Sequence, residues 1–530
     1  MRARMMRHLP LLVAVSLYLA VGFLLLPYYR YQINPDGISY INNTRLLLQG
    51  ELLRAVNNHW NPLISWLLAP FLLFMNDAHL AFKLMNLLIG AAGFFLLNCW
   101  LERLRINGWL RWLVLFILAP VLLWMAISVN SPDLLVSLCL LFYLTLLYRP
   151  GYFERWGNAV GLGLAAGLAY LAKYYALPFI AVHLLVWHAL EYRRQRRAGR
   201  RKVLRSYLIV MLIFIGVVLS WMGLQALKYG QFGRGHHTSG WIFSFIDPHE
   251  KEFPLERSGL VAPPYPGATS IWDDPHSLRV KPWSPWSSPA DMAAYAGIVR
   301  GFFSYFLLLL GQFSPFAAGL LLIFFWFGLK KGASPLSRRE AWQWLLPAGI
   351  YVSGYLLIWV EERYLWFLHL LLIVISLHLV RAWPVLRKSR AGRTVLLLLL
   401  LSFAYYPVEK LVNYLGRGRN YHEIAVQLQA AHLPTLARIA SNAYWNESLY
   451  LCYYRGGLYY GSCTPYRDEA AVHAALQKHK IDYFLHWGRQ PASRFSFLNA
   501  CPELTGGGIE GLRLYDLRGL SEEAAPAPEP

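Results

Sequence analysis

Long apolar runs recur almost without interruption from Leu9 to about Val412, and only the last part of the chain lacks them. A run of about 18 apolar residues is long enough to cross the hydrocarbon core of a bilayer as an α-helix. The pattern therefore predicts eleven membrane spans. They are 9–26, 80–100, 112–127, 134–148, two helices within 158–190 that turn at 173–175, 207–227, a helix ending at 329, 342–360, 365–380 and 394–412.

Two stretches of this pattern are less regular. The run 301–329 is too long for one span, and Gln312 to Pro315 predict a break, so we expect a short surface helix before the span itself. The first span follows arginines as a signal peptide does, but no small-residue cleavage site follows it. We expect this span to be retained.

Basic residues orient the spans. They gather before the first span and in three loops, at 2–7, 193–205, 330–339 and 381–393. Lys and Arg are concentrated in the cytoplasmic loops of membrane proteins. With eleven spans all four clusters fall on one side, which predicts a cytoplasmic N-terminus and an external C-terminus. The same count predicts a first external loop at 27–79 and a long external loop at 228–297.

Composition supports a membrane protein, and cytoplasmic loops account for its net charge. The chain is 56% hydrophobic and 15% charged, with a mean hydropathy of +0.35, which is too apolar for a soluble protein of 530 residues. The formal charge of +21 is compatible with nucleic acid as a partner. Cytoplasmic loops explain the same excess. We therefore predict a polytopic α-helical membrane protein with no nucleic-acid partner.

The tail differs from the membrane domain, 1–412, and reads as a small soluble α/β domain at 413–520. Helical spacing occurs at 419–432 and 468–480, and strands are expected at 435–441, 481–485 and 512–517. The last strand alternates like the edge of a sheet. Residues 521–530, which end in AAPAPEP, are expected to be disordered.

Cysteine and histidine patterns indicate no metal or cofactor. Cys452 and Cys463 flank a Gly-Gly turn, and the sequence leaves open whether they form a disulfide, with Cys501 left over. There is no CxxC spacing. His236, His237 and His249-Glu250 could bind a metal, but a solvated loop is the favoured interpretation. A divalent cation is compatible with the sequence, although no motif indicates one.

Charged side chains gather at the external ends of the spans. They are Asp36, Asp133, Lys173 and the group 361–363. Charge at such depth is costly unless it is paired or faces water, so these residues are candidates for function. Each residue also has a structural alternative. Asp36 lies in a Pro-Asp-Gly turn, where Asp often bonds its own backbone. Asp133 could stabilise the N-terminus of a helix, and Lys173 could extend its amine to the water–membrane interface.

Other features favour chemistry at the same side chains. Two apolar segments of the first loop could lie on the membrane surface and hold Asp36 at the water–lipid boundary. Lys173 beside two tyrosines would suit a phosphate, and Arg363 offers a planar donor fork for one. For Glu362 we favour an internal ion pair that holds the helix hairpin.

Several short motifs occur together in a fixed order. They are Asp36 in the first external loop, Trp60-Asn-Pro-Leu63, Leu67-Leu-Ala-Pro70, Ser131-Pro-Asp133, the run from Gly163 to Lys173, and Glu362-Arg-Tyr-Leu365. With them the membrane domain resembles polyprenol-phosphate-sugar-dependent glycosyltransferases of the GT-C fold. The resemblance is to the branch of bacterial protein O-mannosyltransferases and aminoarabinose transferases, and covers most of the membrane part.

This resemblance implies a reaction and roles. Asp36 would be the general base on an acceptor hydroxyl or amine while the polyprenyl phosphate leaves, with inversion at the sugar carbon. Lys173 and Arg363 would bind the phosphate of the donor. Gly37 stands where some relatives have a second acid, so a second carboxylate would come from Glu51 or Asp133. The expected supporting residues are Glu362, Tyr364, Tyr174 and His59.

The resemblance also implies a location and partners. We expect a bacterial inner-membrane protein with a periplasmic C-terminal domain, a lipid-linked sugar as donor, and a lipid, glycan or protein as acceptor. The Trp-Trp-Asp motif of oligosaccharyltransferases is absent from the sequence, which disfavours oligosaccharide transfer to Asn.

Two other functional classes remain as alternatives. A transporter or flippase of lipid-linked sugars should show inverted repeats and charges in mid-span. The charges here gather at span ends instead. A non-catalytic membrane scaffold with an external binding domain would explain the tail, but not the polar groups expected on one face.

Overall fold

The computed structural model describes residues 2–232, 241–278, 280, 283–330, 335–488 and 493–519. The chain forms two compact units. The helical unit comprises Met1–Tyr29, Asn61–Phe232 and Tyr295–Leu415, and the α/β unit comprises Arg30–Trp60, Gly233–Ala294 and Gly416–Pro530. Much of the first external loop and most of the long external loop thus belong to the same compact unit as the tail.

A helix occurs at each position where a span was predicted. The helices of this part of the chain are α1 Arg2–Tyr29, α4 Leu63–Phe74, α5 Ala78–Arg103, α6 Trp109–Ile127, α7 Asp133–Leu147, α8 Trp156–Ala172, α9 Ala176–Arg194, α10 Arg197–Tyr229, α12 Pro289–Phe313, α13 Ala317–Leu329, α14 Arg338–Leu356, α15 Trp366–Ala382, α16 Val385–Lys388 and α17 Arg390–Asn413. Short 3-10 turns η1 Tyr152–Glu154 and η6 Glu362–Leu365 lie between them.

Seven helices in the described residues are long and apolar enough to cross a membrane, namely α1, α5, α6, α10, α12, α15 with η6, and α17. Four shorter apolar helices accompany them: α4, α7, α8 and α13. The helical membrane fold expected from the sequence is therefore confirmed.

The region before Lys330 differs from the prediction. A break was expected between Gln312 and Pro315, and α12 does end at Phe313. However, α12 has 25 residues and is no short surface helix, whereas α13 has only 13. The helix begins at Pro289, a favoured first residue, and its first turns are too polar to be recognised as part of an apolar run.

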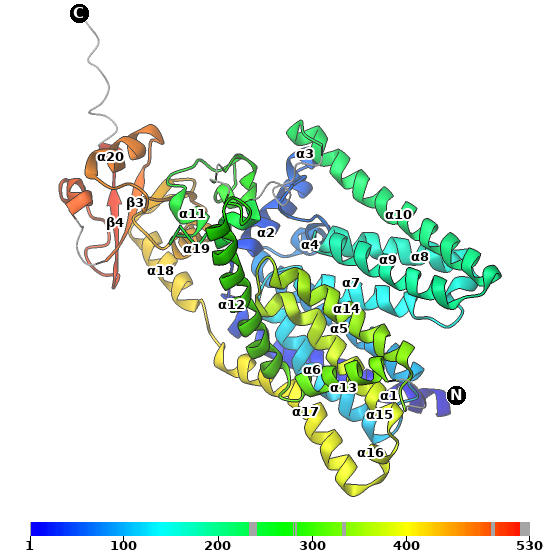
Figure 1. Cartoon of the computed structure of the whole chain (residues 1–530). Helices are drawn as coiled ribbons and strands as arrows, with labels where there is room; N and C mark the ends of the chain where they lie inside the picture. Colours follow the sequence, from blue (N-terminus) through cyan, green and yellow to red (C-terminus); the bar gives the residue numbers. More distant parts are fainter. Residues whose placement is uncertain are drawn as a thin grey trace, which may run out of the picture. The chain divides into compact units, whose positions relative to one another are not determined.

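Helices α8, α9 and α10 lie side by side in the helical unit (Figure 1). Glycines permit this close approach, because a Cβ atom at Gly163 would lie 2.8 Å from Cβ of Ile213. One at Gly167 would lie 2.9 Å from a methyl carbon of Val217. Small residues spaced four apart commonly allow membrane helices to pack at short distance. The turn after α8 carries Lys173, so this packing also supports a candidate site residue.

The α/β unit contains a four-stranded sheet in the order β2-β1-β3-β4. Strand β1 (Arg438–Ser441) is parallel to β2 (Leu458–Ser462) and β3 (Tyr483–Trp487), and β3 is antiparallel to β4 (Leu512–Asp516). The helices of the tail are α18 Arg419–Ala430, α19 Trp445–Arg455 and α20 Glu469–Lys478. The predicted edge strand is β4. The sequence prediction missed α19 and β2, because their aromatic residues follow neither the period of a helix nor that of a strand.

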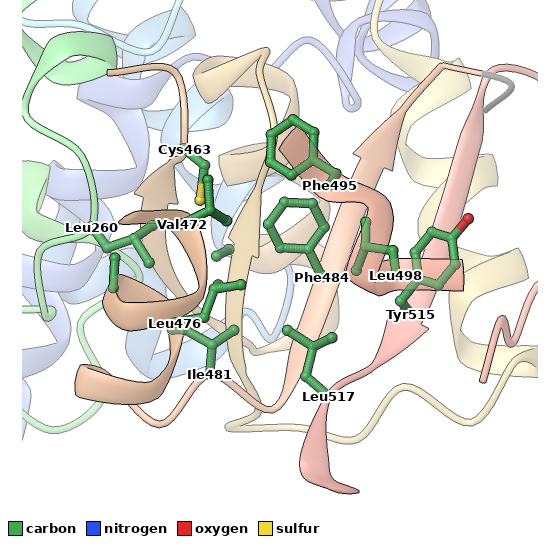
Figure 2. Close-up of a cluster of buried hydrophobic side chains, with 12 residues drawn as sticks. Leu260, Cys463, Val472, Leu476, Ile481, Phe484, Phe495, Leu498, Tyr515 and Leu517 are labelled. Atoms are coloured by element: carbon green, nitrogen blue, oxygen red, sulfur yellow. The ribbon is translucent and has the colours of Figure 1, made fainter. Parts of the chain in front are cut away.

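One hydrophobic core of this unit surrounds Phe484 and Phe495 (Figure 2). Leu260 from the long loop belongs to it, so the loop is part of the folded domain. Cys463 is buried in the same core, whereas Cys452 is buried on α19. No disulfide joins Cys452 to Cys463 in the described residues, which answers the question that the sequence left open.

The two loops also fold together within the α/β unit. Their elements are α2 Pro35–Leu48, α3 Leu52–Ala55, η3 Trp241–Ile246, α11 Pro254–Arg257, η4 Ile271–Asp273 and η5 Pro275–Ser277, and η7 Ser493–Ala500 lies in the tail. Helix α2 packs against η4. His236, His237 and residues 521–530 lie outside the described residues, so the predictions made for them stay predictions.

Candidate functional site

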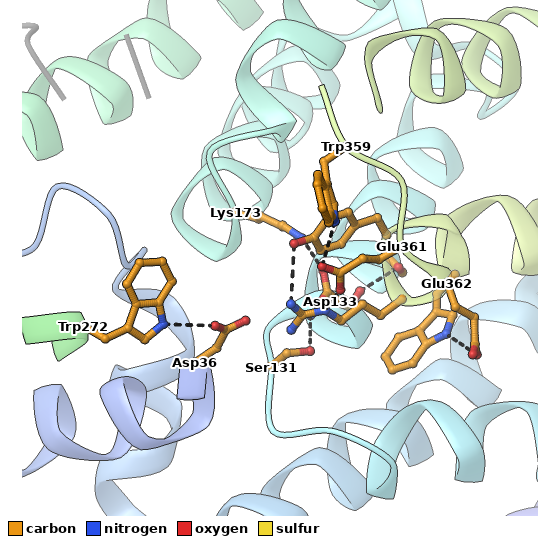
Figure 3. A network of polar contacts seen from close by, with 12 residues as sticks. Asp36, Ser131, Asp133, Lys173, Trp272, Trp359, Glu361 and Glu362 are labelled. Atoms are coloured by element: carbon orange, nitrogen blue, oxygen red, sulfur yellow. Dashed lines mark hydrogen bonds and ion pairs between the residues drawn. The ribbon is translucent and has the colours of Figure 1, made fainter. Parts of the chain in front are cut away.

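The helical unit brings together three of the predicted residues, Asp133, Lys173 and Arg363 (Figure 3). Asp133 is the first residue of α7, and its side chain is 2% exposed. The Lys173 amine forms an ion pair with Oδ1 of Asp133. Nε of Arg363 lies 3.7 Å from Oδ2. A buried carboxylate at a helix N-terminus is thus held by two cations from distant parts of the chain.

An aromatic wall lies beside these cations. Nζ of Lys173 is 3.6 Å from the ring centroid of Tyr364, which places the amine over the ring face. The hydroxyl of Tyr351 donates to the Tyr364 carbonyl at 2.7 Å. The ring of Tyr355 stacks on Tyr364 at 5.1 Å between centroids. The position of Lys173 is therefore fixed by rings as well as by charge.

The internal ion pair predicted for Glu362 is wrong. Its carboxylate accepts hydrogen bonds from Trp124 Nε1 and from the Tyr406 hydroxyl, both at 2.7 Å. Arg363 pairs with the neighbouring Glu361 instead, at 2.7 Å. Consecutive residues of a 3-10 turn point in different directions, so adjacent opposite charges in sequence need not meet. Glu362 fixes the position of η6 against α6 and α17, which leaves its supporting role intact.

Tyr174 holds the turn that presents Lys173. Its backbone N–H donates to Asn61 Oδ1 at 3.0 Å, and Nδ2 of Asn61 donates to the Tyr170 carbonyl at 2.7 Å. The hydroxyl of Tyr174 accepts from Trp221 Nε1 at 3.1 Å. The Trp-Asn-Pro motif thus has a physical function, since its Asn61 clamps both sides of the Lys173 turn.

Asp36 belongs to the α/β unit and lies in the first turn of α2. It is half-buried, and the Trp272 indole donates to Oδ1 at 3.3 Å (Figure 3). The Trp272 carbonyl accepts from Trp60 Nε1 at 2.8 Å and from the Ser39 hydroxyl at 3.2 Å. Because Asp36 and Lys173 belong to different units, the expected meeting of their side chains stays a prediction.

Asp273 is the centre of a buried network behind Asp36. Its carboxylate accepts from Ser39 Oγ at 2.9 Å, from Asn42 Nδ2 at 2.8 Å and from the Thr269 N–H at 2.7 Å. Burial raises the pKa of Asp273, and these three donors partly oppose that rise. Sequence reasoning missed both Asp273 and Trp272, because an Ile-Trp-Asp-Asp run in a long loop matches no general motif.

Two further predicted residues, His59 and Glu51, also belong to the α/β unit. The ring of His59 lies tilted against Trp272 at 4.8 Å and edge-on to Trp60 at 4.4 Å between ring centroids. Glu51 is exposed, pairs with Arg54 at 3.5 Å, and follows the C-terminal end of α2. Since α2 rises about 1.5 Å per residue, roughly 20 Å separate Glu51 from Asp36. We therefore do not retain Glu51 as a second carboxylate.

The described residues contain no group of three or more His, Cys, Asp or Glu side chains arranged to hold a metal ion. His249, one of the loop histidines considered above, has its Nε2 at 2.9 Å from Oδ1 of Asp291.

Comparison with known proteins identifies solved structures of similar fold. No family model and no curated protein sequence matches the chain. A solved structure of the Archaeoglobus fulgidus oligosaccharyltransferase with zinc and sulfate matches at a TM-score of 0.53 and 12% identity, over 90% of this chain and 68% of that one. ArnT from Cupriavidus metallidurans matches in its apo state at 0.54 and 14%, over 97% and 99% of the two chains. The same ArnT bound to undecaprenyl phosphate matches at 0.51 and 13%, over the same shares.

At these identities the likeness establishes the fold. It extends over nearly the whole of ArnT, including the segments that form the α/β unit here. The architecture predicted from the sequence is thereby confirmed, and this chain has the GT-C fold of those membrane transferases.

Proposed function

We propose that the protein is an inverting membrane glycosyltransferase that uses a polyprenyl-phosphate-linked sugar as donor. The observation that carries the proposal is the cluster in which Lys173 and Arg363 share the buried carboxylate of Asp133. Two cations held at the ends of helices can bind the phosphate of an amphiphilic donor and stabilise it as it leaves. A solved relative in fold, ArnT, was crystallised with undecaprenyl phosphate, which agrees with a donor of that kind.

In the proposed reaction, an acceptor hydroxyl or amine attacks the anomeric carbon of the sugar. The bond from that carbon to the phosphate oxygen breaks, and the polyprenyl phosphate leaves with the electron pair. Asp36 takes the proton from the nucleophile. The Trp272 indole donates to one carboxylate oxygen of Asp36 and so orients this carboxylate.

Asp133 has an organising role in this proposal. Its negative charge keeps Lys173 and Arg363 together before the donor arrives. The phosphate then supplies a further anionic partner to both cations. We take these side chains, rather than a divalent cation, as the positive charge of the site, and activity that survives EDTA would support that choice. We further propose the bacterial inner membrane as the location, with transfer on its periplasmic side. The acceptor class, which could be a lipid, glycan or protein, is left for experiment.

Replacement of the proposed base tests the function. We expect Asp36→Asn to lower sugar transfer from a polyprenyl-phosphate donor by about 10²- to 10⁴-fold in purified protein, because Asn cannot accept the proton. The assay follows release of free polyprenyl phosphate and appearance of glycosylated acceptor.

The matched control is Glu423→Gln, which neutralises an exposed carboxylate of the same unit that forms an ion pair with the exposed Arg419. This variant should transfer sugar at the wild-type rate. Undiminished turnover in Asp36→Asn would refute the role of Asp36, and no turnover by the wild type with any lipid-linked donor would favour a flippase or a scaffold.

A further inference from the structure

One segment of the long loop contacts both the sheet and the network behind Asp36. We call this segment, Glu256 to Asp273, the strap. One end contacts β2, the edge strand of the sheet, and the other end contacts α2. All of these contacts lie within the α/β unit. The strap is thus a direct physical connection from the C-terminal sheet to the proposed base.

The sheet end is anchored by the carboxylate of Glu256. It accepts from Ser462 Oγ at 2.9 Å and from Thr464 Oγ1 at 3.0 Å. It also accepts at 2.8 Å from the backbone N–H of Trp445, the first residue of α19. A helix N-terminus beside the carboxyl ends of parallel strands favours negative charge, and α/β proteins often bind anionic ligands there. Here a carboxylate of the chain itself occupies that position.

The strap then follows the edge of β2. Its Val261 N–H donates to the Tyr460 carbonyl, and its Thr269 carbonyl accepts from the Tyr459 N–H, both at 2.7 Å. The pairing of β2 with β1 shifts in register at this point, as in a bulge. A Cβ atom at Gly461 would lie 2.5 Å from the Gly259 carbonyl oxygen. The sequence of β2 therefore leaves room for the strap backbone at its edge.

At its other end the strap holds the donor to Asp36. Asp273 binds Ser39 and Asn42 of α2, while the adjacent Trp272 donates its indole N–H to Asp36. A loop that served only to cover the edge of β2 would need the backbone contacts, but not a carboxylate directed at the N-terminus of α19.

We propose that Glu256 is a positioning residue for sugar transfer, which anchors the strap and thereby holds the Trp272 indole on Asp36. This inference rests on the proposed function, because it concerns the same base. It assigns to the C-terminal domain a direct part in preparing the catalytic carboxylate.

The first test is Glu256→Gln in the full-length protein. Gln keeps the shape but loses the negative charge at the N-terminus of α19. We expect kcat to fall on the order of 10-fold, since small displacements of catalytic groups have large effects on rate. KM for the lipid-linked donor should stay within about 2-fold, because Lys173 and Arg363 are unchanged. Glu423→Gln is again the matched control.

A double-mutant cycle with Trp272→Phe separates positioning from loss of folded protein. If Glu256 acts through Trp272, adding Glu256→Gln to Trp272→Phe should lower kcat by less than about 2-fold further. A purely structural defect would multiply with the effect of Trp272→Phe. Multiplying effects, or an unchanged kcat in Glu256→Gln, would overturn the inference.

Two provisions keep the test decisive. If Glu256→Gln does not fold, Thr464→Val removes a single donor to Glu256 and should show a smaller fall in kcat with the same non-additivity. If the wild type transfers sugar and these variants match it, only the role of the strap is refuted. If the wild type and every variant lack transfer, the proposed function and this inference both fall.

Discussion

Asp133 shows how one residue can determine the arrangement of its site. A buried carboxylate is costly unless it is paired, and the side chain of Asp133 is 2% exposed. Lys173 and Arg363 come from distant parts of the chain and are drawn to this charge. Removing one partner should leave an uncompensated charge, whereas removing both charges of a pair costs much less. The structural and binding roles of Lys173 can therefore be separated.

We predict that Lys173→Met destabilises the protein by roughly 3 kcal/mol and that the double variant Lys173→Met/Asp133→Asn recovers most of that loss. Sugar transfer should stay low in both, because the phosphate has lost a cation. Thermal unfolding in detergent measures the first effect and the transfer assay measures the second.

Lys202→Met provides the comparison for this prediction. It breaks an ion pair with Glu154 whose two side chains are 46% and 61% exposed, so about 1 kcal/mol or less is expected. A stable Lys173→Met single variant, or an active double variant, would contradict the prediction.

At the scale of elements, the packing of α8 against α10 positions the turn that carries Lys173. Gly163 and Gly167 face α10, where added side chains would meet Ile213 and Val217. Membrane helices gain little from the hydrophobic effect within lipid, so close contact between such surfaces contributes strongly to their association. The same helix carries Gly161, where a Cβ atom would meet nothing within 4 Å.

We predict that Gly163→Val destabilises the protein by about 1–3 kcal/mol, because the branched side chain forces α8 away from α10. Sugar transfer should fall as the Lys173 turn moves. The control, Gly161→Val, introduces the same side chain on the same helix and should unfold at nearly the wild-type temperature. Equal stability of the two variants would show that this helix contact is unimportant.

At the scale of the whole molecule, the distribution of basic residues implies one orientation in the membrane. Basic clusters lie at the N-terminal ends of α1, α10, α14 and α17, and the positive-inside rule assigns them to the cytoplasm. The α/β unit, in which the strap and Asp36 lie, would then be external. That arrangement would place the proposed base on the side where a lipid-linked donor presents its sugar.

Sided labelling checks this orientation. In a variant without the five native cysteines, a thiol reagent that cannot cross membranes should label Glu423→Cys in intact spheroplasts. It should label Arg200→Cys only after the membrane is permeabilised. Both positions are exposed, so burial does not account for the difference. The reverse pattern would invert the proposed topology.

The sequence by itself determined the long apolar helices of the membrane domain and the list of charged candidates, because these depend on local composition and on the periodicity of apolar residues. It identified Asp36, Asp133, Lys173 and Arg363, since charge at the ends of apolar runs is unusual. It did not reveal Trp272, Asp273 or Glu256, which lie in a loop without periodicity or a recognised motif.

Only the tertiary structure decided which charges are partners. It paired Arg363 with Glu361 and Asp133, surrounded Glu362 with neutral donors, and separated Glu51 from Asp36 by the length of α2. It also joined the long loop to the C-terminal sheet through Glu256. The physical reason is that local patterns specify helices and strands, whereas ion pairs and hydrogen bonds between distant residues depend on how those elements pack in three dimensions.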